Sequence, residues 1–175
     1  ASVWKWIFAG DGSGILNYFL TQLHLVKAPV SWLTTERGAM TALIITNIWR
    51  GVPFNMLLLA TGLTTLPEEL FEAAAIDGAS RIQRFRHITL PLLKPTILSV
   101  VTLGFIYTFK AFDLIYIMTN GGPLDSTQIL ATASYKLTFS NFEFGQGAAV
   151  ANIMLVLLLV VAIFNLKLME KEEVM

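Results

Sequence analysis

The chain lacks cysteine and is poor in charged residues. Without cysteine among its 175 residues, it has no disulfide framework, thiolate metal site or cysteine nucleophile. Charged side chains make up 14% of the sequence, against roughly 25% in soluble domains. The 12 basic and 12 acidic side chains balance, which excludes nucleic-acid binding driven by charge and a highly charged disordered chain.

Hydrophobic residues, by contrast, make up 55% of the chain, and three stretches concentrate them. A helix needs about 20 mostly apolar residues to cross a bilayer. Residues 40–63, 95–118 and 148–169 meet this requirement. Buried helices of a soluble protein are the alternative, but a chain of this size cannot cover three such helices. We therefore expect an all-α, multi-pass membrane protein in contact with lipid.

The loops between these stretches differ in basic residues. Residues 64–94 contain three arginines and a lysine, whereas residues 119–148 contain only Lys136. Because basic loops stay in the cytoplasm, the difference predicts that 64–94 is cytoplasmic and 119–148 is external. The chain begins with Ala1 on the external side, and we expect it to be the C-terminal part of a longer protein.

The loop 64–94 has the pattern of a helical hairpin. Thr65–Glu68 and Ser80–Gln83 both have the spacing of a capping box. Between them Gly78 suits a tight turn, since glycine accepts backbone angles that other residues resist. Small side chains such as Ala73 and Ala74 would let another surface approach closely. From the residues alone, docking to a partner and bracing of the chain's own bundle both stay open.

Two motifs carry a resemblance to a known family. Glu72-Ala73-Ala74, Gly78 and Ile88-Thr89-Leu90-Pro91 have the spacing of the EAA motif of permeases from binding-protein-dependent ABC importers. Phe112–Tyr116 and Thr119–Pro123 are similar to the sugar-importer subfamily, which the maltose transporter exemplifies. Within it, the chain resembles the larger permease subunit. The resemblance implies a type I ABC importer transmembrane domain, here its C-terminal three transmembrane helices plus a cytoplasmic coupling hairpin.

The resemblance also implies a place in the plasma (inner) membrane of a prokaryote, and an assembly. The assembly comprises a second permease subunit, two cytoplasmic ATPase subunits and an extracytoplasmic solute-binding protein. ATP and magnesium would be held by the ATPase, so we expect neither a cofactor nor enzymatic activity in this chain. We expect Glu72 to contact the ATPase. The expected coupling residues are Glu72, Ala73, Ala74, Asp77, Gly78, Ile88, Leu90 and Pro91.

Charged residues inside the expected spans are the first candidates for a substrate path, because charge at membrane depth usually faces a protein interior or an aqueous cavity. Arg50, Lys110 and Asp113 are three such residues. Lys110 and Asp113 lie three apart, on one helical face, where they would be able to pair. Whether the three contact a substrate or form structural braces stays open.

For the substrate path, the resemblance implies contacts at Trp49, Arg50, Gly51, Phe54, Gly104, Thr108 and Ala111. The sequence departs from the maltose permease at three of these positions. It has arginine at position 50, phenylalanine instead of tyrosine at position 54 and alanine instead of asparagine at position 111. We therefore expect a small-molecule substrate other than maltose, such as another sugar, a glycoside or a phosphorylated polyol.

Together these observations predict a permease subunit of an ATP-driven carbohydrate importer. Two other functions are considered: a membrane scaffold or sensor that docks a cytoplasmic partner, and an ion-driven secondary transporter. We expect no catalytic residues, since no Ser/His/Asp arrangement is present, and no metal site, since the two histidines lack ligand spacing.

Overall fold

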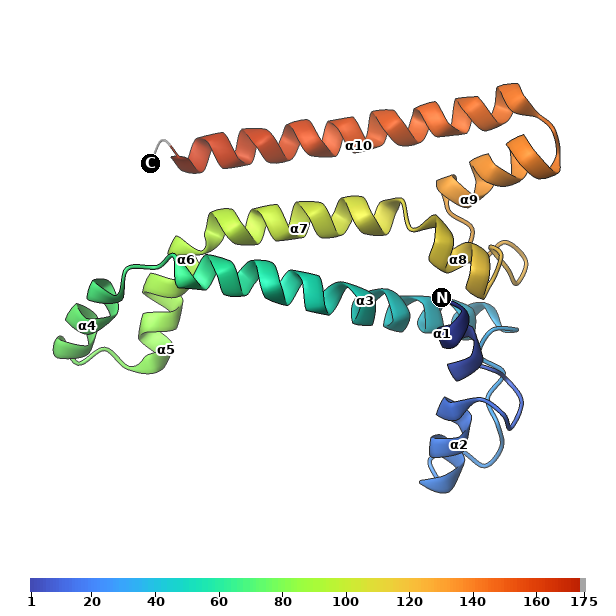
Figure 1. Cartoon of the computed structure of the whole chain (residues 1–175), viewed down its shortest axis with the longest axis horizontal. Helices are drawn as coiled ribbons and strands as arrows, with labels where there is room; N and C mark the ends of the chain where they lie inside the picture. Colours follow the sequence, from blue (N-terminus) through green and yellow to red (C-terminus); the bar gives the residue numbers. More distant parts are fainter. Residues whose placement is uncertain (174–175) are drawn as a thin grey trace. The chain divides into compact units, whose positions relative to one another are not determined.

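The computed structural model describes residues 1–173, without the side chains of residues 166 and 168–173. Throughout this part the secondary structure is helical, with no strand, which confirms the expected all-α class. Figure 1 shows the order of the helices along the chain. The chain divides into two compact units, Ala1–Arg50 with Tyr107–Leu158 and Gly51–Ile106 with Leu159–Met175.

Two expected spans are long continuous helices. α3 runs from Glu36 to Thr64 and contains residues 40–63, and α10 runs from Phe144 to Glu173 and contains residues 148–169. Within the described part, Glu36–Thr64 and Phe144–Asn165 are each long and apolar enough to cross a membrane. Few of their side chains are buried inside the chain, so their apolar surface is left for lipid or for other helices.

The prediction of one continuous helix over 95–118 is wrong. α7 (Lys94–Phe109) ends before α8 (Phe112–Met118) begins. Between them Ala111 has φ −73° and ψ 64°, the angles of an inverse γ-turn. The Phe112 N–H donates to the Lys110 carbonyl over 2.8 Å, as this turn requires. The sequence next to the break has neither proline nor glycine to interrupt a helix. Because Ala111 is 4% exposed, we attribute the break to tertiary packing.

A single hydrophobic core organises the first unit. Helix α8 contributes Leu114, Ile115 and Met118 to this core, and α3 contributes Ala42 and Leu43. The three side chains from α8 are all buried in this core. α1 (Ser2–Ile7) and Phe8, the residue that follows it, close the core from another side.

Asn17 fixes the N-terminal segment of this unit. It lies on α2 (Ile15–Gln22) and is fully buried. Its Nδ2 donates to the carbonyls of Ala9 (2.9 Å) and Val30 (3.0 Å). Its Oδ1 accepts from the Val30 N–H (3.0 Å) and from Trp32 Nε1 (3.1 Å). All four hydrogen bonds of the amide are therefore satisfied inside the protein.

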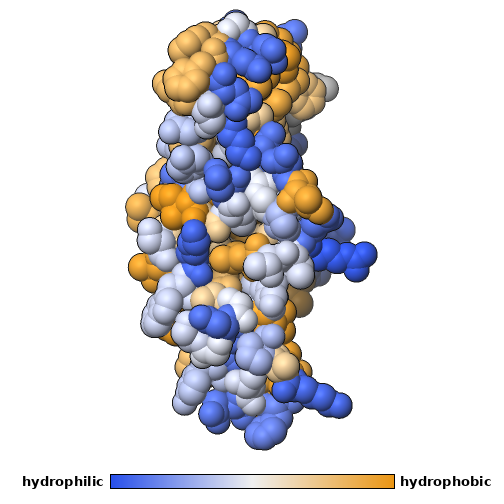
Figure 2. Space-filling model, turned by 90° about the vertical axis from the view of Figure 1, so that its right-hand side faces the viewer, coloured by the Kyte–Doolittle hydropathy of each residue, from blue (hydrophilic) through white to orange (hydrophobic). Residues whose placement is uncertain are grey.

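The segment between α8 and α10 contains α9 (Leu130–Tyr135) and the π-helical turn η2 (Lys136–Ser140). Figure 2 views the chain from the right-hand side of Figure 1, where hydrophilic and weakly polar side chains cover much of the surface, with apolar ones between them. A mixed surface of this kind suits contact with water better than the continuous apolar surface of a span does.

The second unit contains the expected hairpin. α4 (Glu68–Ile76) is followed by a turn, α5 (Arg81–Arg84), the π-helical turn η1 (Phe85–Thr89) and α6 (Leu90–Leu92), which leads into α7. The capping box of Ser80 and Gln83 is confirmed in both directions. The box expected at Thr65 is wrong, because Pro67 is the N-cap and Thr65 Oγ1 donates to the Gly62 carbonyl instead.

Candidate functional site

Two polar contacts hold the helix break against α3. Asn47 Nδ2 donates to Thr108 Oγ1 over 3.0 Å, just before the break. Arg50 Nη1 lies 2.9 Å from Asp113 Oδ2, just after it. Asn47 and Arg50 are three residues apart on α3 and therefore share one face. One face of α3 thus contacts the end of α7 and the start of α8.

The pairing considered for Lys110 and Asp113 is wrong. The interruption at Ala111 removes the helical relationship that would have placed the two side chains together. Asp113 pairs with Arg50, whereas Lys110 Nζ lies over the Tyr107 ring, 5.4 Å from its centroid. Of the three charged residues expected in the spans, two therefore form one ion pair.

A cavity of about 330 Å³ lies at the break. Thr108 and Ala111, both expected on the substrate path, line it together with Asn47. The other lining residues are mostly apolar and come from α3, α8 and the loop after α8: Met40, Leu43, Ile44, Ile48, Leu114, Ile115, Thr127, Gln128 and Ile129. An apolar cavity with a few convergent polar groups is the usual form of a small-molecule site.

The structure does not bring all the expected path residues to this cavity. The Trp49 ring packs edge-on against Trp4, with 5.3 Å between the centroids. Arg50 and Asp113 lie on the first unit with the cavity but do not line it. Gly51, Phe54 and Gly104 belong to the second unit. The roles of all these residues in transport stay predictions.

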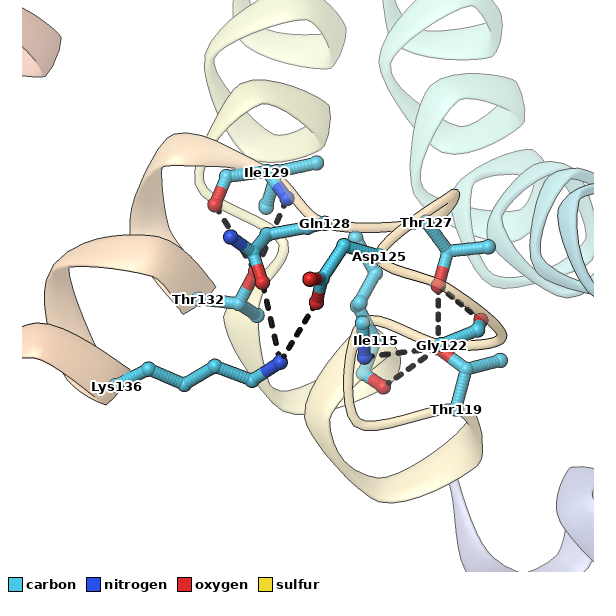
Figure 3. Close-up of polar contacts among 10 residues, drawn as sticks. Ile115, Thr119, Gly122, Asp125, Thr127, Gln128, Ile129, Thr132 and Lys136 are labelled. Carbon is cyan, nitrogen blue, oxygen red and sulfur yellow. Dashed lines mark hydrogen bonds and ion pairs between the residues drawn. The ribbon is translucent and has the colours of Figure 1, made fainter. Parts of the chain in front are cut away.

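The loop after α8 supplies cavity residues that sequence reasoning missed. Thr127 is 2% exposed, and its hydroxyl contacts Thr119 Oγ1 (2.8 Å) and donates to the Gly122 carbonyl (2.7 Å). Figure 3 shows these contacts, and also those of Lys136 with Asp125 and Gln128. The backbone turns at Gly121-Gly122-Pro123, but no sequence signal indicated that residues 127–129 fold back onto the break.

Aromatic side chains join α8 to the segment that follows. The ring of Tyr135 lies 4.9 Å from that of Phe112, 5.1 Å from that of Tyr116 and 5.1 Å from that of Phe139, between centroids. A hydrogen bond with Tyr116 raises the pKa of Tyr135 above its ordinary value, and charge repulsion and desolvation add to the effect. The cluster therefore fixes α9 against the start of α8.

The hairpin turn has the geometry of a Schellman motif. The Ala79 N–H donates to the Ala74 carbonyl (2.9 Å) and the Gly78 N–H donates to the Ala75 carbonyl (3.1 Å). Gly78 has φ +76°, which glycine adopts without steric cost. Of the expected coupling residues, Ala74 and Ile88 are partly buried, and the exposed ones are Glu72, Ala73, Asp77, Gly78, Leu90 and Pro91.

Large apolar side chains on the hairpin are also open to solvent. Ile76 is 86% exposed, Ile82 is 79% exposed and Phe85 is 58% exposed. They lie on α4, on α5 and at the start of η1, close to the expected coupling residues in sequence. These exposed side chains are candidates for an interaction surface. In the part of the chain that the structure describes, no acidic residues or histidines cluster as a metal site would require.

Comparison with known proteins finds relatives over most of the chain. The chain is 40% identical over 99% of its length to a probable ABC transporter permease protein of Brucella suis biovar 1, of which it covers 60%. It is 39% identical over 88% of its length to the trehalose/maltose transport system permease protein MalF of Thermococcus litoralis, of which it covers 51%.

A solved structure shares the fold. A bacterial ABC transporter involved in the import of the acidic polysaccharide alginate matches 97% of this chain and 59% of its own chain, with a TM-score of 0.84 and 23% identity. The fold is therefore that of a type I ABC importer transmembrane domain. The chain spans about three fifths of the length of the first relatives it matches. Residues 2–170 match the family model described as the binding-protein-dependent transport system inner membrane component, and the chain belongs to that family.

Proposed function

We propose that this chain is part of the permease subunit of an ATP-driven importer. It forms part of the translocation path for a carbohydrate-type solute and transmits the motion of a separate ATPase. The observation that carries the proposal is the hairpin around Gly78, whose capped helices present the EAA-motif residues at the surface. The names of relatives, such as the trehalose/maltose permease, support the carbohydrate class.

The hairpin is suited to transmit force. The Schellman turn closes α4, and the capping box of Ser80 starts α5, so neither helix end depends on the partner for its backbone hydrogen bonds. The exposed Ile76, Ile82 and Phe85 would bury apolar area in a cleft of the ATPase. Movement of the ATPase would then swing the attached helices as rigid bodies.

The break between α7 and α8 is suited to bind the solute. Its cavity of about 330 Å³ has polar groups from Asn47 and Thr108 on otherwise mostly apolar walls. Arg50 is neutralised by Asp113 at 2.9 Å, and none of the described residues that line the cavity itself is charged. This uncharged lining favours a neutral sugar over a phosphorylated polyol.

The proposed assembly has the partners that such an importer needs. These are a second permease subunit, two cytoplasmic ATPase subunits that hold ATP and magnesium, and an extracytoplasmic solute-binding protein. The topology that the basic residues predict places the hairpin in the cytoplasm and the 119–148 loop outside. The family description, an inner membrane component of a binding-protein-dependent system, supports this arrangement.

The test uses the full-length permease, expressed with the ATPase and solute-binding protein encoded beside it. We expect the ATPase to co-purify and Gly78→Asp to abolish uptake while the protein remains in the membrane. A side chain at φ +76° strains the turn, and the aspartate adds a charge to the surface that would contact the ATPase. Gly12→Asp, at an external loop glycine with open space around it, is the matched control and should transport normally.

Other outcomes would distinguish the alternatives. Substrate-stimulated ATP hydrolysis that is normal in Gly78→Asp would refute the coupling role of the hairpin. Uptake that depends on an ion gradient, without any bound ATPase, would indicate a secondary transporter. A bound cytoplasmic partner without uptake would indicate a scaffold or sensor.

A further inference from the structure

Gln128 occupies a central position on the first unit. It lines the 330 Å³ cavity at the helix break and a neighbouring cavity of about 600 Å³, which it shares with Thr108. It also lines a third cavity of about 410 Å³ whose walls include Tyr116 and Asn120. The same side chain therefore borders the break, where the solute is proposed to bind, and the loop that follows α8.

Lys136 fixes which way the amide of Gln128 faces. Lys136 Nζ lies 3.1 Å from Gln128 Oε1 and 3.1 Å from Asp125 Oδ1 (Figure 3). An ammonium group only donates hydrogen bonds, so the amide oxygen must face it. The Nε2 group is then turned away from Lys136, and none of the hydrogen bonds among the described residues uses its two hydrogens.

The surrounding backbone holds this arrangement. Gly121 has φ +84°, and a Cβ at this position would lie 3.2 Å from Lys136 Nζ and 3.4 Å from Gln128 Oε1. Because Gly121 has no side chain, Lys136 and Gln128 have the space to make this contact. The Gln128 N–H donates to the Asp125 carbonyl over 3.0 Å, so the backbone of Gln128 is held by the same loop that supplies the ion pair.

We propose that Gln128 is a specificity-determining residue of the substrate path, which donates an Nε2 hydrogen bond to a hydroxyl oxygen of a saccharide, and that Lys136 is the positioning residue that aims it. The inference rests on the proposed carbohydrate import. Asp125 neutralises Lys136 at 3.1 Å, so the site offers an oriented neutral donor.

The chemistry of the walls supports a neutral polyhydroxylated ligand. Around the 600 Å³ cavity, Phe109, Ile129, Leu130 and Ala133 are apolar, and only Thr108 and Gln128 carry polar side chains. Where few polar groups are present, one oriented donor has a large effect on which ligand is accepted. A site that pairs with a hydroxyl disfavours an analogue that lacks this hydroxyl, since the protein donor is left unpaired.

The experiment uses the full-length permease in proteoliposomes with its ATPase and solute-binding protein. The probes are trehalose, maltose and diacetylchitobiose, and the sugar with the highest wild-type uptake is then compared with its monodeoxy analogues. Gln128→Glu keeps an acceptor for Lys136 but replaces the free donor by an acceptor. Gln128→Leu removes both groups. Gln22→Glu, on an exposed position of α2, is the matched control.

We expect Gln128→Glu and Gln128→Leu to lower uptake about 3- to 10-fold, the effect of one hydrogen bond. Gln128→Leu should also lose the wild-type preference for the parent sugar over one monodeoxy analogue. Lys136→Met should weaken this preference, and Lys136→Arg, which also only donates, should restore it. A purely structural role would not change selectivity among analogues.

Two results would overturn the inference in different ways. If the Gln128 variants keep wild-type selectivity, or lose it equally for all analogues, Gln128 is not the donor, and the proposed import stands. If the wild-type assembly takes up neither these three sugars nor any other saccharide or glycoside, the carbohydrate proposal fails and this inference fails with it.

Discussion

Arg50 on α3 and Asp113 on α8 form an ion pair, with 2.9 Å between Nη1 and Oδ2, directly beyond a break in the α7–α8 path. Three residues earlier on α3, Asn47 contacts Thr108 before the break. α3 therefore contacts both sides of the interruption at Ala111. A relative movement of the two sides must strain or separate at least one of these contacts.

The first prediction concerns this pair. Single variants Arg50→Asp and Asp113→Arg should lower uptake, and the double variant with exchanged charges should recover it. Because the side chains are 45% and 63% exposed, we expect a coupling free energy of only about 0.2–1 kcal/mol in water. A double-mutant cycle on thermal unfolding measures it. Lys110→Met, which leaves the pair untouched, should show no coupling with Asp113→Asn.

Gly78 provides the second prediction. A Cβ at this position meets open space, but φ is +76°, so alanine should cost about 1 kcal/mol through backbone strain alone. Hydrogen exchange of the Gly78 and Ala79 amides should accelerate by about 5-fold, the equivalent of that free energy. Gly12→Ala, with open space and no positive φ, should leave the hairpin unchanged. Equal effects of the two substitutions would contradict the strain argument.

The cap of α5 gives the third prediction. Ser80→Ala removes the acceptor of the Gln83 N–H and should destabilise the first turn of α5 by about 1 kcal/mol. Exchange at the Gln83 amide reports this directly. Thr65→Ala, at the position where the sequence wrongly predicted a second capping box, should have no effect on exchange in the first turn of α4. A matching loss of protection there would mean that Thr65 caps α4 after all.

The fourth prediction tests a close contact between α3 and α7 inside the second unit. A Cβ on Gly62 would lie 2.7 Å from Thr96 Cγ2 and 3.0 Å from Leu93 Cδ1. Gly62→Ala should therefore lower the melting temperature by several degrees, since overpacking costs about 1–3 kcal/mol. Thr96→Ala should relieve most of the loss in the double variant. Strictly additive effects would show that the two helices are not in contact at this point.

Asn17 gives the fifth prediction. Asn17→Leu leaves the carbonyls of Ala9 and Val30 without their donor, and each buried unpaired group costs about 1–3 kcal/mol. We expect strong destabilisation of the N-terminal segment and a shift in the emission of Trp32, which donates to Asn17. Asn141→Leu, at an exposed asparagine, is the control and should behave as wild type.

Some features were predictable because they depend on short-range chemistry. The Ser80–Gln83 box and the turn at Gly78 follow from residues within a few positions of one another. The spans of α3 and α10 follow from apolar length alone. The Thr65 box failed because Pro67, without an N–H, took the N-cap position in an extended conformation.

Features that depend on distant contacts were not predictable. Nothing near Ala111 breaks a helix by itself, and the interruption depends on the packing of Leu114, Ile115 and Met118 against α1 and α3. The pairing of Asp113 with Arg50 follows from that break. Gln128 was missed for the same reason, because its place beside Thr108 arises from the folded loop.

The inverse γ-turn at Ala111 has a consequence for hydration. A helix end leaves backbone N–H and C=O groups without partners inside the helix, and hydrocarbon supplies none. The Phe112 N–H is satisfied within the turn, but the next amides of α8 begin a new helix and need acceptors. Lipid tails would leave these amides unpaired, so the break must face protein, water or the hydroxyl groups of a passing solute instead.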